Sequence, residues 1–465
     1  MALIKSISGI RGTIGGIAGD NLTPEDVVAC TAAFGYWTIQ RTGNNKMVIG
    51  RDGRISGEMV SSLVVATLRG LGIQVVDLGL STTPTVAMAV PAEKAGAGII
   101  ITASHNPKNW NALKFLNSAG EFISGQDGQE VLSLIGSGMI QYAPVEKLGA
   151  YSLASHYIDW HIQQILDLPL VDTGLVAEKK FKVVVDAINS SGAIAVPKLL
   201  EAMGCKVFLL NGEPHGAFAH NPEPLPEHLT ELSKAVLSNG AQLGIAVDPD
   251  VDRLAFVCDD GEMFGEEFTL VAVSDYILQN KPGNTVSNLS STKALKEVTE
   301  KAGGSYTASA VGEVNVVAAM KATNAVIGGE GNGGIIYPDL HYGRDALVGI
   351  ALMLTHLAKF GKPLSFLRKR YPAYVISKNK LQLPETTNLD QLFAQLKHQY
   401  KNQRINTVDG LKIEFDNDWI HLRRSNTEPI VRIYAESTSP VIADHLVNKI
   451  KTDIYDLLKG ENGQD

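Results

Sequence analysis

A chain of 465 residues, of which 45% are hydrophobic and 19% charged, is too long for one hydrophobic core and too apolar to be disordered. We therefore expect a globular protein of several domains. The net charge of −8 disfavours nucleic acid as the main partner, because a phosphate backbone calls for a basic surface.

Short β-branched runs, each followed by a turn and a helical period, recur along the first three quarters of the chain. Examples are the strands predicted at residues 46–50, 96–101 and 181–186. Strands that alternate with helices form βαβ units in mixed α/β sheets, and right-handed crossovers gather the loops after the strands on one edge. Ligands of open α/β sheets bind at that edge, so we look for catalytic residues there.

Polar or proline-rich interruptions near residues 150, 260 and 371 divide the chain into four predicted domains. The first three are predicted to be α/β domains with mixed sheets, and the last a smaller α+β domain. In that last segment a helical stretch precedes strands of the antiparallel type. The predicted boundaries are 1–150, 151–258, 259–371 and 372–465.

The first motif is TASHNP at residues 102–107, directly after a predicted strand. Asn106 and Pro107 favour a turn, so Ser104 is presented at the carboxyl end of a strand, a suitable place for a nucleophile. A polar turn without catalytic function is the alternative for this motif alone. A serine-hydrolase elbow is a poor fit, because GxSxG is absent and His105 is too close in sequence to turn back as general base.

The second motif is DPDVDR at residues 248–253, which follows the apolar run LGIAV. Alternate spacing places Asp248, Asp250 and Asp252 on one side of an extended segment. Three close carboxylates repel one another unless a cation compensates, and oxygen ligands suit Mg²⁺. An EF-hand is excluded because Arg253 stands where that loop requires glycine, whereas an exposed acidic turn remains the structural alternative.

The third motif is GGEGNGG at residues 328–334. A dinucleotide fingerprint would need a helix next, but IIYPD follows, so we do not expect a dinucleotide loop. Glycines around Glu330 and Asn332 suit a loop that binds sugar hydroxyls, and a glycine-rich turn is the alternative.

The fourth motif is RRSNTEP at residues 423–429, with Arg432 beyond it. Guanidinium, hydroxyl and amide donors in one turn can hold a phosphate dianion. A solvated basic loop is the alternative interpretation.

Together and in this order, the four motifs resemble those of the α-D-phosphohexomutase family, which includes phosphoglucomutases, phosphomannomutases and phosphoglucosamine mutases. SGIRG at residues 8–12 and GRDGRISG at residues 50–57 are also similar to family sequences. The resemblance spans the whole chain. It implies four domains around a central cleft, of which three share an α/β topology, and each domain contributes one loop to the site.

The resemblance also implies a role for each matching residue. Ser104 would be the phosphorylated nucleophile, with Arg11 and Arg253 beside the reacting phosphate and Lys114 and His105 as candidates for general acid or base. The phosphoserine at Ser104 and the carboxylates of Asp248, Asp250 and Asp252 would hold Mg²⁺. The sugar hydroxyls would bind Glu330 and Asn332, and the phosphate that is not reacting would bind Arg423, Ser425, Asn426, Thr427 and Arg432.

The implied reaction is an isomerisation that interconverts a sugar 6-phosphate and a sugar 1-phosphate, with a hexose 1,6-bisphosphate as intermediate and activator. Glucosamine phosphate is the favoured substrate, and a dual-specificity phosphoglucomutase/phosphomannomutase is the alternative. A serine-dependent sugar phosphatase is disfavoured by the second phosphate site. An inactive sugar-phosphate sensor is disfavoured by the retention of Ser104, the three aspartates and Lys114.

Three positions depart from the family pattern. Gly334 and Glu313 stand where several relatives carry histidine, and Arg424 replaces a usual proline. The missing histidine at 334 leaves the general base unassigned, and the other two changes bear on the choice of substrate.

Small sugar phosphates are the expected partners, with neither nucleic acid nor a membrane, and the chain is expected to act as a monomer or homodimer. Its longest apolar stretch, Ala346–Leu357, is too short to span a membrane, and its start has no apolar segment of signal-peptide length. The three cysteines form no CxxC pair, which disfavours a disulfide framework. We expect a cytoplasmic protein.

Overall fold

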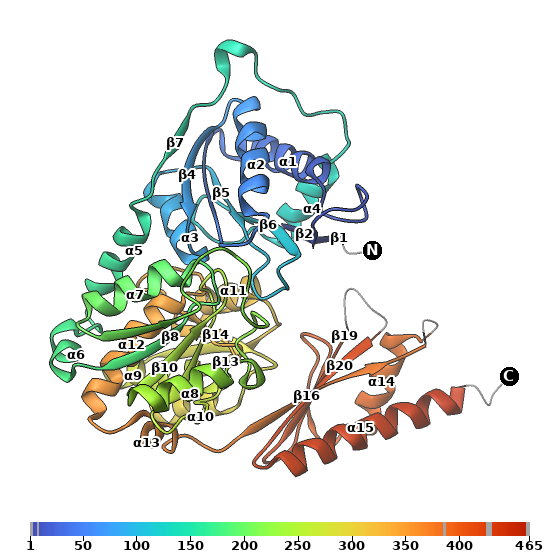
Figure 1. Cartoon of the computed structure of the whole chain (residues 1–465). Coiled ribbons are helices and arrows are strands. Elements are labelled where there is room, and N and C mark those ends of the chain that lie inside the picture. The colour runs from blue at the N-terminus through green and yellow to red at the C-terminus, as the bar shows by residue number, and fades with distance from the viewer. Residues whose placement is uncertain (1–2, 7–8, 385–386, 425–429, 462–465) are drawn as a thin grey trace.

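The computed structural model describes residues 3–6, 9–384, 387–424 and 430–461. They form four units in chain order, each built on its own sheet. Figure 1 shows the first unit above the second and third, which lie against each other, and the fourth to one side. Three units carry mixed α/β sheets and the fourth an antiparallel sheet, so the predicted fold class is confirmed.

The first unit contains a seven-stranded sheet in the order β1-β2-β6-β5-β3-β4-β7. Strands β3, β4, β5 and β7 are parallel, and β1, β2 and β6 are antiparallel to their neighbours. The elements are β1 (Leu3–Ser6), β2 (Gly9–Thr13), α1 (Pro24–Thr42), β3 (Lys46–Arg51), α2 (Gly57–Gly70), β4 (Gln74–Leu80), α3 (Thr83–Ala92), β5 (Ala97–Ile101), β6 (Trp110–Leu116), α4 (Gly125–Leu134), η1 (Val145–Lys147) and β7 (Tyr151–Leu153).

The second unit has four strands in the order β11-β10-β8-β9, of which only β11 is antiparallel to its neighbour. All five residues of β10 are buried, as expected for a central parallel strand. The elements are α5 (Tyr157–Leu166), α6 (Thr173–Lys179), β8 (Lys182–Asp186), α7 (Gly192–Ala202), β9 (Lys206–Leu210), η2 (Pro226–His228), α8 (Thr230–Asn239), β10 (Leu243–Val247) and β11 (Leu254–Cys258).

The third unit repeats this plan in the order β13-β12-β14-β15, again with one antiparallel edge strand. The apolar stretch noted in the sequence is helix α12, whose residues 346–358 are buried. The elements are α9 (Glu266–Asn280), β12 (Asn284–Asn288), α10 (Ala294–Lys301), β13 (Tyr306–Ser309), α11 (Glu313–Thr323), β14 (Ala325–Glu330), β15 (Gly334–Ile336), α12 (Ala346–Phe360) and α13 (Leu364–Arg368).

The fourth unit is a five-stranded antiparallel sheet in the order β16-β20-β19-β18-β17. Two helices, α14 and α15, contribute to its own apolar core. The elements are β16 (Val375–Gln382), α14 (Leu389–Gln399), β17 (Arg404–Asn406), β18 (Leu411–Glu414), β19 (Trp419–Arg424), β20 (Ile430–Ser437) and α15 (Pro440–Glu461).

The units differ in how closely they are joined. The second and third units share one continuous apolar core, whereas the fourth has an apolar core of its own and forms several hydrogen bonds to the third. The buried ammonium of Lys412 donates to the carbonyl of Leu289 at 2.7 Å, and Ser290 Oγ lies 3.0 Å from His421 Nδ1. A polar interface of this kind favours motion between units, because few apolar contacts must be broken to move one against the other.

A buried polar junction ties the first three units together. His161 on α5 contacts Thr85 Oγ1 of the first unit at 2.9 Å through Nδ1, and Asp345 Oδ2 of the third unit at 2.9 Å through Nε2. His341 Nε2 lies 3.2 Å from the same carboxylate oxygen. Asp345 also caps α12, so this junction fixes the start of that helix relative to the two other units.

No helix in the described parts of the chain is long and apolar enough to cross a membrane.

Candidate active site

Ser104 is held in a rigid loop at the carboxyl end of β5. Its backbone has a positive φ of 48°, and its side chain is buried. The fully buried Arg54 donates to the backbone carbonyls of Ser104, Asn106, Pro107 and Trp110. Asp52 pairs with Arg54 at 3.0 Å and accepts a hydrogen bond from the side chain of Thr102. These contacts fix the position of the Ser104 hydroxyl.

The three aspartates of the second motif line a tight turn after β10. Asp248 Oδ1 accepts hydrogen bonds from the backbone N–H groups of Asp252 and Arg253, each at 3.1 Å. Val251 has a φ of 63°, which is strained for a β-branched residue and lets the chain turn between the carboxylates. All three aspartates are buried, and one ligand atom from each lies within 4.8 Å of the others.

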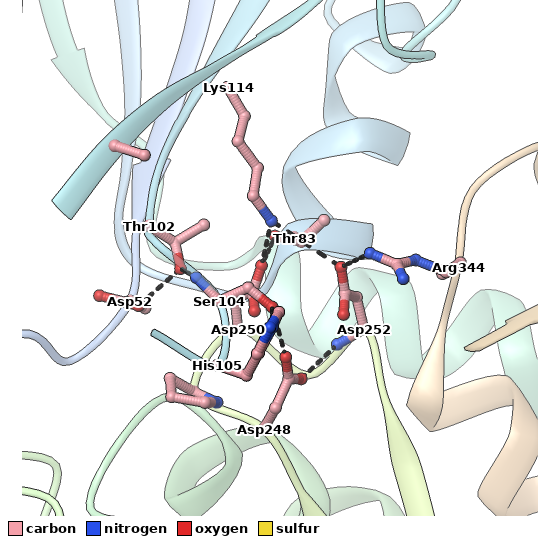
Figure 2. A network of polar contacts seen from close by, with 12 residues as sticks. Asp52, Thr83, Thr102, Ser104, His105, Lys114, Asp248, Asp250, Asp252 and Arg344 are labelled. Atoms are coloured by element: carbon pink, nitrogen blue, oxygen red, sulfur yellow. Dashed lines mark hydrogen bonds and ion pairs between the residues drawn. The ribbon is translucent and has the colours of Figure 1, made fainter. Parts of the chain in front are cut away.

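The two loops meet, as Figure 2 shows. Ser104 Oγ donates to Asp248 Oδ2 at 2.7 Å, although the residues are 144 positions apart. Lys114 on β6 donates to Asp250 Oδ2 at 2.8 Å and lies 3.8 Å from Asp252 Oδ2. The nucleophile candidate, the acidic cluster and a cation from the first unit therefore form one centre.

Burial and charge set the protonation of this centre. Burial, together with the charges of Asp250 and Asp252, raises the pKa of Asp248 well above its usual value. Burial would also raise the pKa of Asp250, but the neighbouring Lys114 outweighs it and lowers that pKa. Burial, with Arg253 and other nearby cations, lowers the pKa of His105 to about 2, so its imidazole is neutral.

The acidic cluster fits a hard divalent cation. Within the part of the chain that the structure describes, Asp250 Oδ1 and Asp252 Oδ1 are buried and lack a hydrogen-bond partner. Buried carboxylate oxygens without partners are costly, and a cation would satisfy them. The donors are all oxygen atoms, the type that Mg²⁺ selects.

Arg344 connects this centre to the glycine-rich loop. It donates through Nη2 to Asp252 Oδ2 at 2.7 Å, through Nη1 to Glu330 Oε2 at 3.0 Å and through Nε to Glu313 Oε2 at 2.9 Å. Its side chain also explains Gly334, because a Cβ at that position would lie 2.4 Å from Arg344 Cδ. The residue that replaces the expected histidine at 334 therefore leaves room for Arg344.

We expect the Arg344→Ala variant to be destabilised by about 3–5 kcal/mol, because it leaves the buried Glu330 and the mostly buried Glu313 without an ion-pair partner and takes one of two cations from Asp252. Chemical denaturation measures the change. Lys281→Ala is the matched control: it removes an exposed ion pair to Asp339 at 2.7 Å and should cost less than about 1 kcal/mol. Equal stabilities of the two variants would contradict a structural role for the Arg344 cluster.

The glycine-rich loop joins two antiparallel strands, β14 and β15. This hairpin confirms that the loop is not followed by the helix that a dinucleotide site requires. Glu330 is buried and accepts hydrogen bonds from Asn288 Nδ2 at 2.9 Å and from the backbone N–H of Gly312 at 3.1 Å. Asn332 is partly exposed in the loop, and its Oδ1 accepts from the backbone N–H of Gly334 at 3.3 Å.

The arginines of the fourth unit lie on its antiparallel sheet. Arg423 and Arg432 are directly opposite each other on β19 and β20, so their side chains share one face of the sheet. Arg423 pairs with Asp409 at 2.9 Å. Partial desolvation and the charge of Arg432 lower the pKa of Arg11, so these two guanidinium groups of the first and fourth units influence each other.

The structure thus brings together only part of the predicted site. Ser104, His105, Lys114 and the three aspartates form one centre. Arg253 is next to it and pairs with Glu223 at 3.3 Å, and Glu330 joins it through Arg344. Among the residues that the structure describes, Arg11, Arg423 and Arg432 form no hydrogen bond or ion pair with this centre. Ser425, Asn426 and Thr427 lie outside the described residues.

Sequence reasoning did not find several residues that build the site. Arg344, Thr83 and the Asp52–Arg54 pair belong to this group, and Thr83 Oγ1 donates to Asp250 Oδ2 at 2.5 Å. The motif GRDGRISG at residues 50–57 could have indicated the Asp52–Arg54 pair, because these two charged residues directly follow a predicted strand. No comparable signal marks Arg344, whose three carboxylate partners come from distant parts of the chain.

Comparisons with known proteins agree with this architecture. Models of the four phosphoglucomutase/phosphomannomutase domains match the chain in order: alpha/beta/alpha domains I, II and III match residues 4–139, 157–261 and 265–374, and the C-terminal domain matches residues 380–452. The fold and the site therefore define a protein built from the complete set of these four domains.

The chain belongs to the phosphoglucomutase/phosphomannomutase family. It is 35% identical over 438 residues to a probable phosphoglucosamine mutase of Methanopyrus kandleri, with 93% of each chain covered. It is 34% identical over 435 residues to a phosphoglucomutase/phosphomannomutase of Thermococcus kodakarensis, with 92% of this chain and 94% of the relative covered. A crystal structure of a family protein from Burkholderia thailandensis superimposes with a TM-score of 0.84 at 27% identity and covers 97% of this chain and 96% of that one.

Proposed function

We propose that this chain is a hexose-phosphate mutase that transfers a phosphoryl group through Ser104. The observation that carries the proposal is the 2.7 Å hydrogen bond from Ser104 Oγ to Asp248. It places a nucleophile from one unit directly on an acidic cluster from another. A serine alone could be a structural residue, whereas a buried serine beside three aspartates and Lys114 is equipped for phosphoryl transfer.

In the proposed reaction, phospho-Ser104 donates its phosphoryl group to O1 or O6 of a bound hexose monophosphate. The Oγ–P bond breaks, a bond from phosphorus to the sugar oxygen forms, and the hydroxyl proton replaces phosphorus on Oγ. The resulting 1,6-bisphosphate reorients, and Ser104 is phosphorylated again from its other end. Arg54, which holds the backbone of the serine loop, would keep Oγ in a fixed position for the transfer.

Mg²⁺ is the proposed cofactor, held by Asp248, Asp250, Asp252 and an oxygen of the phosphoserine. When bound, it supplies positive charge that stabilises the transferring phosphoryl group. The unpartnered Oδ1 atoms of Asp250 and Asp252 support this assignment. Lys114 lies against the same carboxylates and adds a second positive charge to the site.

Arg423 and Arg432, which stand opposite each other on β19 and β20, are proposed to bind the phosphate that is not reacting. They belong to the fourth unit whereas Ser104 belongs to the first, so this pair of arginines, the phosphate cradle, is separate from the reacting group and can accept either phosphate of the bisphosphate. A phosphatase needs no second phosphate site, and a sensor needs no serine placed on an acidic cluster. These features favour a mutase over both alternatives.

Arg423→Ala is therefore expected to raise KM for the sugar phosphate at least about tenfold with a smaller change in kcat, because it removes a charge-assisted contact to a part of the substrate that does not react. Steady-state kinetics with a coupled assay measures both constants. Arg404→Ala, an exposed arginine on β17 of the same unit, is the control and should leave KM unchanged. A normal KM for Arg423→Ala would contradict the proposed cradle.

Glucosamine phosphate is the proposed substrate, in keeping with the name of the Methanopyrus relative. The Thermococcus relative, named a phosphoglucomutase/phosphomannomutase, makes glucose and mannose phosphates the second candidate. We also propose that the reaction takes place in the cytoplasm, since the three buried cysteines are free thiols, as in a reducing compartment.

The test is ³¹P NMR of the purified protein with Mg²⁺, a trace of hexose 1,6-bisphosphate, and glucosamine, glucose or mannose 6-phosphate in separate samples. Formation of a sugar 1-phosphate supports the mutase, and the order of the rates identifies the substrate. Release of inorganic phosphate would instead identify a phosphatase. No change in any sample would contradict an enzymatic function on these sugars.

A further inference from the structure

Near the glycine-rich loop, Glu313 and Glu330 carry more negative charge than Arg344, the cation between them, can balance. Asp252, Glu313 and Glu330 all form ion pairs with the single guanidinium of Arg344, at 2.7, 2.9 and 3.0 Å. Among the described residues, Arg344 is the only basic side chain that forms an ion pair with either glutamate. Asp252 also lies 3.8 Å from Lys114, so the uncompensated charge falls on the two glutamates: when both are ionised, they carry one more negative charge than Arg344 balances.

Glu313 has the geometry of an ionised acceptor. Its Oε2 accepts from Arg344 Nε at 2.9 Å, and its Oε1 accepts from the backbone N–H of Arg344 at 3.1 Å. A carboxylate has about four lone-pair sites, so each oxygen can accept a further hydrogen bond. The side chain is one-tenth exposed, which leaves it in reach of a ligand.

Glu313 lies beside the residue proposed to bind the sugar hydroxyls. The backbone N–H of the preceding residue, Gly312, donates to Glu330 Oε1 at 3.1 Å. Arg344 then joins both glutamates to Asp252 of the acidic cluster. Glu313 is thus part of the connection between the sugar loop and the centre that holds Ser104.

The geometry of a hexose relates this position to one carbon of the substrate. Carbon 2 lies between the hydroxyl at carbon 3 and the anomeric carbon, whose oxygen reacts. A hexose with its ring hydroxyls at Glu330 and its O1 at Ser104 would have carbon 2 between these two contacts, on the side where Arg344 bridges Glu330 and Asp252. Glu313 forms its ion pair with the same Arg344.

We propose that Glu313 is a specificity-determining residue that binds the 2-ammonium group of an amino-sugar phosphate. The inference rests on the proposed mutase function and assigns its substrate choice to a residue. An ammonium group offers a charge-assisted hydrogen bond and offsets the excess negative charge, whereas the neutral 2-hydroxyl of a glucose phosphate offers only an ordinary hydrogen bond. A carboxylate here also repels phosphate, in contrast to a histidine.

The experiment compares glucosamine 6-phosphate with glucose 6-phosphate on wild type, Glu313→Gln and Glu313→His. For each protein, kcat/KM is measured with both substrates, and dissociation constants are measured by isothermal titration calorimetry. The ratio between the two substrates within one preparation is independent of the fraction of folded protein. Glu121→Gln is the matched control, because it removes a different carboxylate, the partner of Lys321 on α11, without touching Arg344.

We expect wild type and Glu121→Gln to prefer glucosamine 6-phosphate, and both Glu313 variants to lower that preference at least about tenfold in kcat/KM and in affinity. A wild type without this preference, or a preference that changes less than about twofold in both variants, would overturn the inference. If the preference depends on Glu313 but no 1-phosphate forms, the amino-group site stands and the mutase function fails. If 1-phosphate forms and the preference for glucosamine 6-phosphate survives in the variants, the mutase function stands and the amino-group site at Glu313 fails.

Discussion

The Ser104→Ala variant is expected to lose mutase turnover by at least about 10³-fold, because no phosphoryl group can be carried on alanine. The substitution leaves the Cβ in place, and the positive φ of 48° is no less favourable for alanine than for serine. It removes one hydrogen bond to Asp248, while the hydrogen bond from the backbone N–H of residue 104 to Thr102 remains. Loss of activity should therefore occur in a folded protein.

The measurement is ³¹P NMR of sugar 1-phosphate formation, supported by a thermal melt and by intact mass. Wild type should carry one phosphoryl group after incubation with a hexose 1,6-bisphosphate, and the variant should carry none. Ser133→Ala, an exposed serine on α4, is the control and should behave as wild type in all three measurements. Turnover by Ser104→Ala, or a phosphoryl group on another residue, would remove Ser104 from the mechanism.

The centre of the site could be predicted because ligands of open α/β sheets bind at the loops that follow the carboxyl ends of the strands. Ser104 follows β5 and Asp248 follows β10, and both strands are continuous apolar runs that are wholly buried in the structure. In each sheet the loop after such a strand lies at the edge where ligands bind. The sequence pattern alone placed each residue at such an edge. The family resemblance was needed to predict that the two edges face each other.

The ion pairs of Arg344 could not be predicted from the sequence pattern. Its partners are separated from it by 92, 31 and 14 positions and come from a turn, a helix start and a hairpin. Sequence periodicity reports which face of an element is buried, but it carries no information on which loops of two units are packed together. The same limit applies to Arg54, a charged residue whose complete burial depends on carbonyls of the serine loop.

The Asp250→Asn variant tests the acidic cluster and is expected to weaken the apparent affinity for Mg²⁺ by at least about 100-fold, with turnover falling in parallel at limiting Mg²⁺. Asparagine keeps the size of the side chain and can still accept the hydrogen bond from Thr83, but it removes the charge that faces Lys114. It also replaces Asp250 Oδ1, one of the two carboxylate oxygens of the acidic cluster that are buried without a hydrogen-bond partner among the described residues.

The measurement is turnover as a function of Mg²⁺ concentration after treatment with a chelator. Asp260→Asn is the control: this aspartate follows the same sheet and is exposed, so its Mg²⁺ curve should overlay that of wild type. Higher Mg²⁺ should restore part of the activity of Asp250→Asn if the loss is one of metal affinity, because Asp248 and Asp252 remain. An unchanged Mg²⁺ curve would place the metal elsewhere and leave the unpartnered oxygens of this turn unexplained.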